Sequence, residues 1–254
     1  MEYLLKASAV IAIFYICYKL FLQRDTFFQS NRWFLLIGLI TAFLLPFVVI
    51  PIYIEYTPMP IQNFVINDTS AFVEIAEEPY NLWYYAFIVY IIGVIVFSMR
   101  FLVQLGSLAL LILNNEKYKQ NGFTFIETQN DTPPFSFFRW VVYNPNQFNE
   151  TELQHIITHE KVHVKQYHSI DIIISQLAAI VFWFNPITWF YKKDLQQNLE
   201  FIADYKAQNI TSCKKSYQHL LLKTSMPNQH IAITNNFYNS LIKKRIVMLH
   251  KSKS

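Results

Sequence analysis

The segment His159-Glu160-Lys161-Val162-His163 matches the H-E-x-x-H pattern, whose residue types and spacing are those of a zinc-binding helix. Residues four apart lie on the same face of an α-helix, so the imidazoles of His159 and His163 can bind one Zn²⁺. Glu160 lies one step round the helix, where its carboxylate can take a proton from water at the open coordination position. Water activated in this way attacks peptide carbonyls. The pattern therefore predicts a zinc peptidase with Glu160 as the general base, and an ordinary polar helix face is the alternative.

A catalytic zinc needs a third ligand from the protein. The metzincin arrangement is excluded because Ser169 stands where that pattern requires a histidine, six residues after His163. A single glutamate, Glu200, follows Glu160 in the chain, and we predict that it is the third ligand. Asp204 lies one helical turn further on, where its carboxylate can accept the free N–H of a ligating histidine. The other histidines near the motif are interpreted as surface or packing residues: His155 and His168.

The motif needs a helix to present it. Asn149 or Thr151 can cap the N-terminus of a helix that runs to about Gln166. The segment Thr151–His168 is polar on most sides, which disfavours a site within a membrane-spanning helix. We therefore expect the motif on a helix outside the hydrocarbon region.

The segment between the motif and Glu200 constrains the topology. Ile170–Phe184 is strongly apolar and is followed by Asn185-Pro186 and by a second predicted helix, from Ile187 to about Ala207. A single membrane crossing at Ile170–Phe184 would place Glu200 on the opposite side of the membrane from the two histidines. We therefore expect a buried core helix, or a re-entrant hairpin that dips into the membrane and turns at Asn185-Pro186.

Two short runs rich in aromatic and β-branched residues precede the motif, Phe123–Thr128 and Phe135–Tyr143. A turn sequence that contains Pro133-Pro134 separates them, so the pattern predicts two strands around a turn. The second strand could present an edge to which an extended substrate adds above the zinc. A purely structural role for its aromatic residues is the alternative.

The composition indicates a membrane protein. Hydrophobic residues make up 53% of the 254 residues and charged residues only 15%, against about 25% in an ordinary soluble domain. Two cysteines are too few for a secreted disulfide scaffold. Since a helix needs about 20 apolar residues to cross a bilayer, we predict three N-terminal spans, at residues 4–22, 33–54 and 82–102, the last continuing as a helix towards Leu113.

The charges between the spans predict an orientation. Residues 55–81 contain five acids and no Lys or Arg, whereas Arg24 and Arg32 lie between the first two spans. The positive-inside rule therefore places the N-terminus outside and residues 114–254 in the cytoplasm. Residues 114–254 carry 16 Lys and Arg against 10 Asp and Glu. We interpret this excess as solvated surface attracted to anionic lipid, and we expect no nucleic-acid partner.

The combination of three spans, H-E-x-x-H at His159–His163, the turn at Asn185-Pro186 and E-x-x-A-D at Glu200–Asp204 resembles a known family. It is similar to the membrane metallopeptidases of the beta-lactam sensor–transducer (BlaR/MecR) type, which use a gluzincin zinc site. A Pro-Pro-Phe-Ser-Phe strand at residues 133–137 is a further similarity, and the resemblance covers essentially the whole chain.

This resemblance implies a mainly α membrane protein. Residues 1–113 would form the transmembrane helical domain and residues 114–254 a cytoplasmic α+β zinc peptidase domain with a short sheet. It implies zinc ligands His159, His163 and Glu200, the base Glu160, and Asp204 behind a ligating histidine.

The resemblance also implies a role in signalling, in which an external stimulus triggers cleavage of a cytoplasmic protein, such as a transcriptional repressor, or of the receptor itself. Full-length sensors continue into a further span and an extracytoplasmic penicillin-binding domain. The present sequence ends at Ser254, so beta-lactam sensing is not part of the expectation.

Two other functions fit parts of the sequence. The first is a non-catalytic membrane signalling or scaffold protein that retains zinc for its fold. Glu160 argues against it, because a structural zinc site needs no base and closes the fourth position. The second is a prenyl-protein-type membrane peptidase, which shares the zinc motifs but needs more spans to enclose a lipidated peptide than the three found here.

Overall fold

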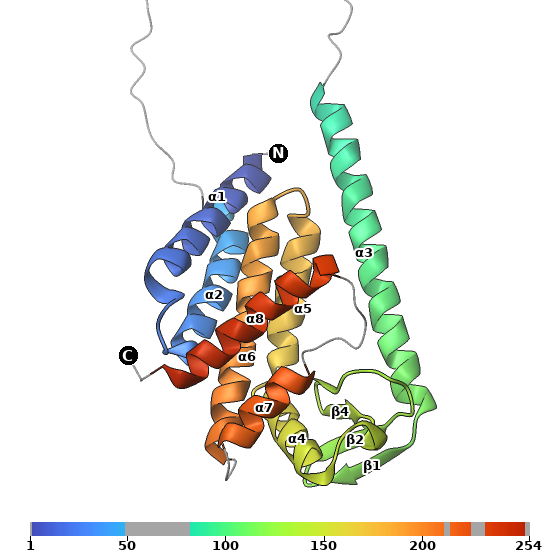
Figure 1. The fold of residues 1–254 in the computed structure, drawn as a ribbon. Coiled ribbons are helices and arrows are strands. Elements are labelled where there is room, and N and C mark those ends of the chain that lie inside the picture. Colours follow the sequence, from blue (N-terminus) through green and yellow to red (C-terminus); the bar gives the residue numbers. More distant parts are fainter. Residues whose placement is uncertain (1, 49–81, 211–213, 225–231, 252–254) are drawn as a thin grey trace, which may run out of the picture.

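The computed structural model describes residues 2–48, 82–210, 214–224 and 232–251, and the fold of this part is mainly helical (Figure 1). The predicted outer loop at residues 55–81 lies outside the described residues. The described part contains eight α-helices: α1 (Glu2–Cys17), α2 (Phe28–Leu44), α3 (Leu82–Asn114), α4 (Glu150–Lys165), α5 (His168–Val181), α6 (Pro186–Ile210), α7 (Lys214–Thr224) and α8 (Ala232–His250). The mainly α prediction with a small sheet is confirmed.

Within the residues that the structure describes, three helical segments are long and apolar enough to cross a membrane, namely Glu2–Leu22, Phe28–Phe47 and Leu82–Asn114. The first consists of α1 and a turn of π-helix, and it agrees with the predicted span at 4–22. The third, α3, continues past residue 102 as predicted. The second differs from the predicted 33–54, because its helix already begins at Phe28 and its described part ends in a 3₁₀ turn around Pro46. Residues 49–54 of that prediction lie outside the described residues.

The central element is a hairpin of α5 and α6 that packs against α1 and α2 (Figure 1). Its turn lies at Asn185-Pro186, as predicted: the Asn185 side chain accepts the backbone N–H of Ile187, and Pro186 begins α6. The 14-residue α5 therefore leads away from the end of α4, and α6 leads back to it. A returning hairpin, rather than a single crossing, connects the histidine motif to Glu200.

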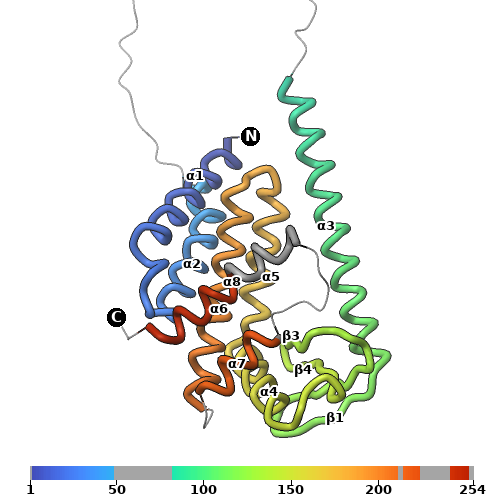
Figure 2. Tube along the Cα trace, viewed as in Figure 1, coloured from blue at the N-terminus to red at the C-terminus, as the bar shows by residue number. Residues whose placement is uncertain are grey.

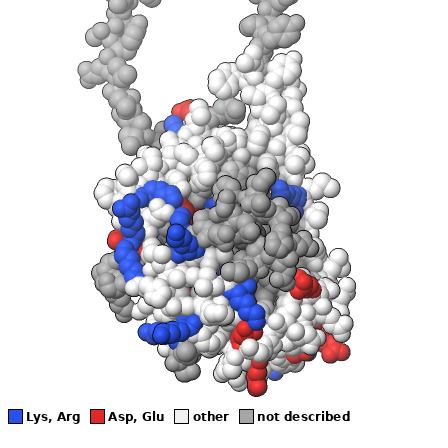
Figure 3. Space-filling view, viewed as in Figure 1, with Lys and Arg blue, Asp and Glu red and all other residues white. Residues whose placement is uncertain are grey.

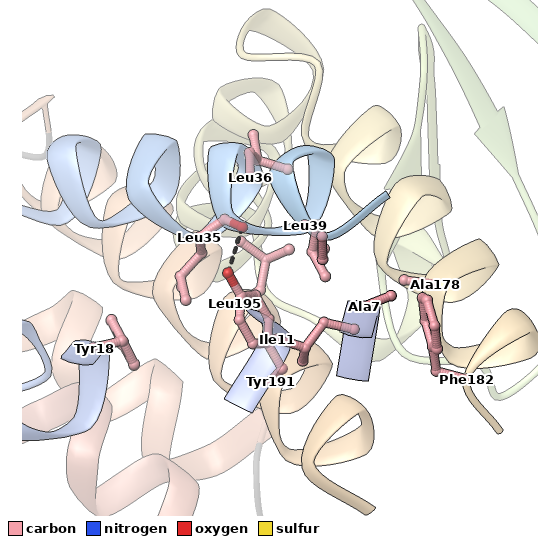
Figure 4. Packing of buried hydrophobic residues seen from close by; sticks show 11 residues of the cluster. Ala7, Ile11, Tyr18, Leu35, Leu36, Leu39, Ala178, Phe182, Tyr191 and Leu195 are labelled. Atoms are coloured by element: carbon pink, nitrogen blue, oxygen red, sulfur yellow. Dashed lines mark hydrogen bonds between the residues drawn. The ribbon is translucent and has the colours of Figure 1, made fainter. Parts of the chain in front are cut away.

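The largest hydrophobic cluster joins this hairpin to the first two helices (Figure 4). Ile11 of α1 and Leu35 of α2 are fully buried there beside Tyr191 of α6. The Tyr191 hydroxyl donates to the Leu35 carbonyl at 2.6 Å, so the one polar atom that it brings into the cluster is satisfied. The cluster combines residues from before and after position 113, and the division into domains 1–113 and 114–254 stays a prediction.

Helix α3 contacts the rest of the molecule at the turn of the hairpin. The Trp183 indole N–H donates to the Tyr90 carbonyl at 3.2 Å, and its ring stacks on Phe97 at 6.0 Å between centroids. Gly93 provides the space, because a Cβ there would lie 2.1 Å from the Trp183 ring. The C-terminal end of α3 makes a second contact, with the sheet, where Ile112 is buried against Ile126 and Val142. The remaining surface of this helix is largely apolar and exposed.

The sheet has four strands: β1 (Lys117–Gln120), β2 (Phe123–Glu127), β3 (Phe135–Phe137) and β4 (Trp140–Tyr143). Their order is β1-β2-β4-β3, with β2 and β4 parallel. The first predicted strand is confirmed as β2, whereas β1 was not predicted. The second predicted strand was wrong, since the run Phe135–Tyr143 is itself a hairpin of β3 and β4. The reason is Phe138, which adopts φ 49° and whose N–H donates to the Ser169 hydroxyl at 2.8 Å. A bulky residue at positive φ is not a recognisable turn signal in a sequence.

Helix α4, which carries the H-E-x-x-H motif, begins after Asn149, one of the two caps that the sequence predicts. Asn149 is the N-cap of α4, and a capping box forms because its side chain accepts the Glu152 N–H while the Glu152 carboxylate accepts the Asn149 N–H. Two further helices, α7 and α8, follow α6. Figure 2 shows α8 running across α6 towards the end of α1.

We expect Gly93→Ala to lower the thermal stability of the protein in detergent, because the added methyl group overlaps the Trp183 indole. Overpacking of this kind costs about 1–3 kcal/mol. Gly106 of the same helix is the matched control, since a Cβ there meets nothing within 4 Å. Gly106→Ala should leave stability unchanged or raise it by up to about 1 kcal/mol. Equal shifts in Tm for the two variants would contradict the packing of α3 on Trp183.

Candidate metal centre

Three side chains from two helices meet at one point. His159 and His163 of α4 lie beside Glu200 of α6, and their ligand atoms are all within 4.8 Å of one another. The two Nε2 atoms are 3.1 Å apart, and the Glu200 carboxylate oxygens lie 3.4 Å and 3.6 Å from them. Ligands of a tetrahedral zinc, each about 2.0–2.1 Å from the ion, stand about 3.3 Å apart. The three predicted ligands therefore fit one metal ion.

A buried polar cluster lies behind His159. Its Nδ1 atom is 2.8 Å from the Tyr217 hydroxyl of α7, which in turn donates to Asp204 at 2.8 Å. Asp204 is fully buried, and the Arg245 guanidinium of α8 binds both of its carboxylate oxygens at 2.7 Å. Arg245 also lies 3.1 Å from Glu200. The predicted position of Asp204 behind a histidine is thus observed, 3.3 Å from Nδ1, within a larger cluster.

A second buried chain lies behind His163. Its Nδ1 atom is 2.7 Å from Nδ1 of His168, whose other ring nitrogen lies 3.3 Å from the Gln166 side-chain oxygen. Arg32 of α2 donates to that same oxygen at 3.3 Å and to the Gln166 backbone carbonyl at 2.9 Å. Arg32 also pairs with the buried Asp171 of α5 at 2.7 Å. The side chains behind this histidine therefore extend to the start of the second apolar helix.

The predicted base lies on the wall of the same cavity. Glu160 is buried, and the Ser136 hydroxyl of β3 donates to its Oε2 atom at 2.6 Å. The cavity has a volume of about 350 Å³ and is lined by residues of β3, α4, α5, α6, α7 and α8 together with Pro133 and Pro134. The Glu200 side chain is 36% exposed, so the meeting point of the three ligands is open to this cavity.

The charges around the site favour a cation between the three ligands. Burial raises the pKa of the Glu200 and Asp204 carboxyls, but Arg245 and the imidazoles outweigh it and hold both values below their ordinary range. Burial lowers the pKa of His159, but Asp204 and Glu200 outweigh it and raise the value to about 10. Burial lowers the pKa of His163, which favours the neutral form of its ring, the form that binds a metal.

The sequence matches the family model described as BlaR1 peptidase M56 over residues 4–249, nearly the whole chain. The chain belongs to this family. Together with the three apolar helices, membership of the M56 family indicates a membrane protein of metallopeptidase type.

Curated relatives carry matching names. A methicillin resistance mecR1 protein of Staphylococcus aureus is 32% identical over 114 residues, which are 39% of this chain and 18% of that protein. The regulatory protein BlaR1 of Staphylococcus aureus is 23% identical over 224 residues, 75% of this chain and 38% of that protein. The regulatory protein BlaR1 of Bacillus licheniformis is 27% identical over 109 residues, 40% of this chain and 18% of that protein. The chain thus spans well under half the length of these relatives.

Several residues at this M56 centre were missed by sequence reasoning. His168 was interpreted as a surface or packing residue, yet it is buried against His163. Arg245 stands in the basic run Lys243-Lys244-Arg245, and the basic excess of residues 114–254 was interpreted as solvated surface attracted to anionic lipid. Ser136 lies in the Pro-Pro-Phe-Ser-Phe strand that carried part of the family resemblance, but nothing there pointed to a contact with Glu160. Tyr217 gave no signal, because nothing in its spacing relates it to the H-E-x-x-H motif.

We expect Tyr217→Phe to weaken the affinity of the purified protein for Zn²⁺, used as the probe metal, by about 10–100-fold. The change removes the hydroxyl that lies between His159 Nδ1 and Asp204, and with it the group that fixes the orientation of the ring. Competition with a chromophoric chelator measures the affinity. Tyr167→Phe is the control, since Tyr167 is 57% exposed. Unchanged zinc affinity in the Tyr217 variant would contradict this role.

Proposed function

We propose that this protein is an integral membrane zinc endopeptidase that cleaves a cytoplasmic regulator, such as a transcriptional repressor, or its own chain. The observation that carries the proposal is the meeting of His159, His163 and Glu200 beside the buried carboxylate of Glu160 in one open cavity. Membership of the BlaR1 peptidase M56 family supports it. Regulatory proteins among the relatives support the role in signalling.

In the proposed reaction, His159, His163 and Glu200 would hold zinc, which when bound would supply Lewis acidity that polarises a peptide carbonyl and makes water acidic near neutral pH. The Ser136 hydroxyl occupies Oε2 of Glu160, so Oε1 takes the proton from the attacking water. Water oxygen bonds to the carbonyl carbon, the C–N bond breaks, and Glu160 returns the proton to the leaving amine. Asp204 and Tyr217 hold His159 in place while this occurs.

We further propose that the substrate binds in extended form along β3. This strand lies at one edge of the sheet, and its residues Phe135 and Ser136 line the cavity. A peptide added to the free edge of β3 would form main-chain hydrogen bonds that do not depend on its sequence. Its scissile bond would then lie next to Glu160.

The decisive comparison is wild type against Glu160→Gln in purified, detergent-solubilised protein. We expect both to hold one zinc per chain, while cleavage of the protein itself or of cytoplasmic proteins falls by a factor of about 10²–10⁴ in the variant. Glu150→Gln, at the exposed start of the same helix, should leave cleavage unchanged. Zinc-loaded wild type and Glu160→Gln that cleave equally would defeat the mechanism. Bound zinc without any cleavage in the wild type would instead favour the scaffold alternative.

We propose that the metal centre faces the cytoplasm and that the N-terminus lies outside. The support is the position of Arg24 and Arg32 at the end of the spans nearest the centre, together with the positive-inside rule. A fluorescent protein fused after Ser254 should therefore fluoresce in cells. This orientation would be contradicted if the fluorescent fusion stayed dark while an alkaline phosphatase fused at the same place was active.

A further inference from the structure

A second and larger cavity lies away from the metal centre. It has a volume of about 700 Å³ and opens between the end of α1, the middle of α6 and the C-terminal part of α8. We call it the α1–α8 groove, and its lining residues divide into two sets. The apolar floor includes Tyr18, Phe201, Val247 and Met248, and the cationic rim consists of Arg24, Lys243, Lys244 and Lys251.

The rim carries positive charge that the groove itself does not balance. Asp194 is the one acid in the lining, and it is already paired with Lys19 at 2.6 Å and accepts a hydrogen bond from the Tyr15 hydroxyl. Lys251 donates to the backbone carbonyl of Arg24, so these two residues are neighbours on the rim. Among the described residues, no ion pair neutralises Lys243 or Lys244. Figure 3 shows Lys and Arg side chains in an arc around an uncharged hollow at the left of the view.

The groove lies where a bilayer surface would meet the protein. Tyr18 belongs to the last, π-helical turn of the first candidate membrane span, and Arg24 follows directly after that span ends. Like charges collected around an apolar cleft repel one another unless an anion binds between them. An anion that carries a hydrocarbon chain can pair with the cations of the rim and also cover the apolar floor. A soluble phosphate compound satisfies only the rim.

We propose that the α1–α8 groove binds an anionic phospholipid, with the phosphate of the headgroup against Lys243, Lys244 and Arg24 and an acyl chain along Tyr18, Phe201 and Val247. The site has a direct structural link to the metal centre. Helix α8 carries both Lys243 and Lys244 on the rim and Arg245, which binds Asp204 and Glu200. A lipid in the groove therefore holds in place the helix that supplies the guanidinium.

Native mass spectrometry of the full chain, purified in a neutral detergent with added phosphatidylglycerol or phosphatidylcholine, tests the proposal. We expect the wild type to retain phosphatidylglycerol and not phosphatidylcholine. The double variant Lys243→Gln/Lys244→Gln should retain it about thirty-fold more weakly, since each cation near an anionic headgroup contributes about a factor of five. Lys214→Gln/Lys215→Gln makes the same change of charge on the exposed start of α7 and should behave as wild type. Equal retention of the two lipids by the wild type would overturn the proposal. Equal retention of phosphatidylglycerol by the two double variants would also overturn it.

A second variant tests the apolar floor without disturbing the fold. Val247 is 57% exposed, so Val247→Asp should keep the wild-type circular dichroism spectrum while it abolishes retention of phosphatidylglycerol. Displacement of the lipid by millimolar inorganic phosphate would overturn the proposal in favour of a soluble-anion site. Zinc content and cleavage are measured on the same samples. Lipid retention alone tests the lipid site, whereas zinc content and cleavage test the proposed peptidase. A failure of one proposal is therefore distinguishable from a failure of the other.

Discussion

The candidate metal centre depends on the contacts that the Arg245 guanidinium makes with two carboxylates of α6. Glu200 and Asp204 lie one turn apart on α6, and burying two carboxylates side by side is costly unless a cation binds them both. Arg245 does so with a bidentate contact to Asp204 and a further contact to Glu200. The chain must therefore return across α6 some 41 residues after Asp204, which explains why α8 packs where it does.

The sequence alone allowed the three clustered side chains, the proposed ligands, to be selected, because each of them follows a local rule. His159 and His163 share a helical face through their spacing, and Glu200 is the one glutamate left after Glu160. Asn149 was one of two predicted caps, and the Asn185-Pro186 turn has a recognised signature. Local rules of this kind could not identify Arg245, Tyr217 or Ser136, whose roles arise from tertiary contacts across long sequence separations. Phe138 illustrates the same limit, since a contact with Ser169 fixes a turn that its own residue type disfavours.

The apolar hairpin of α5 and α6 explains how a hydrophobic segment can lie in the chain between the residues of one polar site. Helix α5 is too short to cross a bilayer alone, and Tyr191 of the returning α6 ties the hairpin to α2 inside the main core. The three ligands can therefore lie together although a stretch as apolar as a membrane segment separates them in the chain. The same packing brings α2 into contact with the start of α5. Arg32 of α2 therefore lies beside the candidate metal centre, where it pairs with Asp171.

The contacts of Arg32 connect the position of α2 to the side chain of His163. Its guanidinium joins α2 to His163 through Gln166 and His168, and it is itself held by the buried Asp171. Hydrogen bonds fail within a few tenths of an ångström beyond their normal length, and a buried charge that loses its partner is expensive. Sliding or rotation of α2 would therefore have to break these contacts. Only the side chains of Gln166 and His168 stand between Arg32 and His163, one of the proposed ligands.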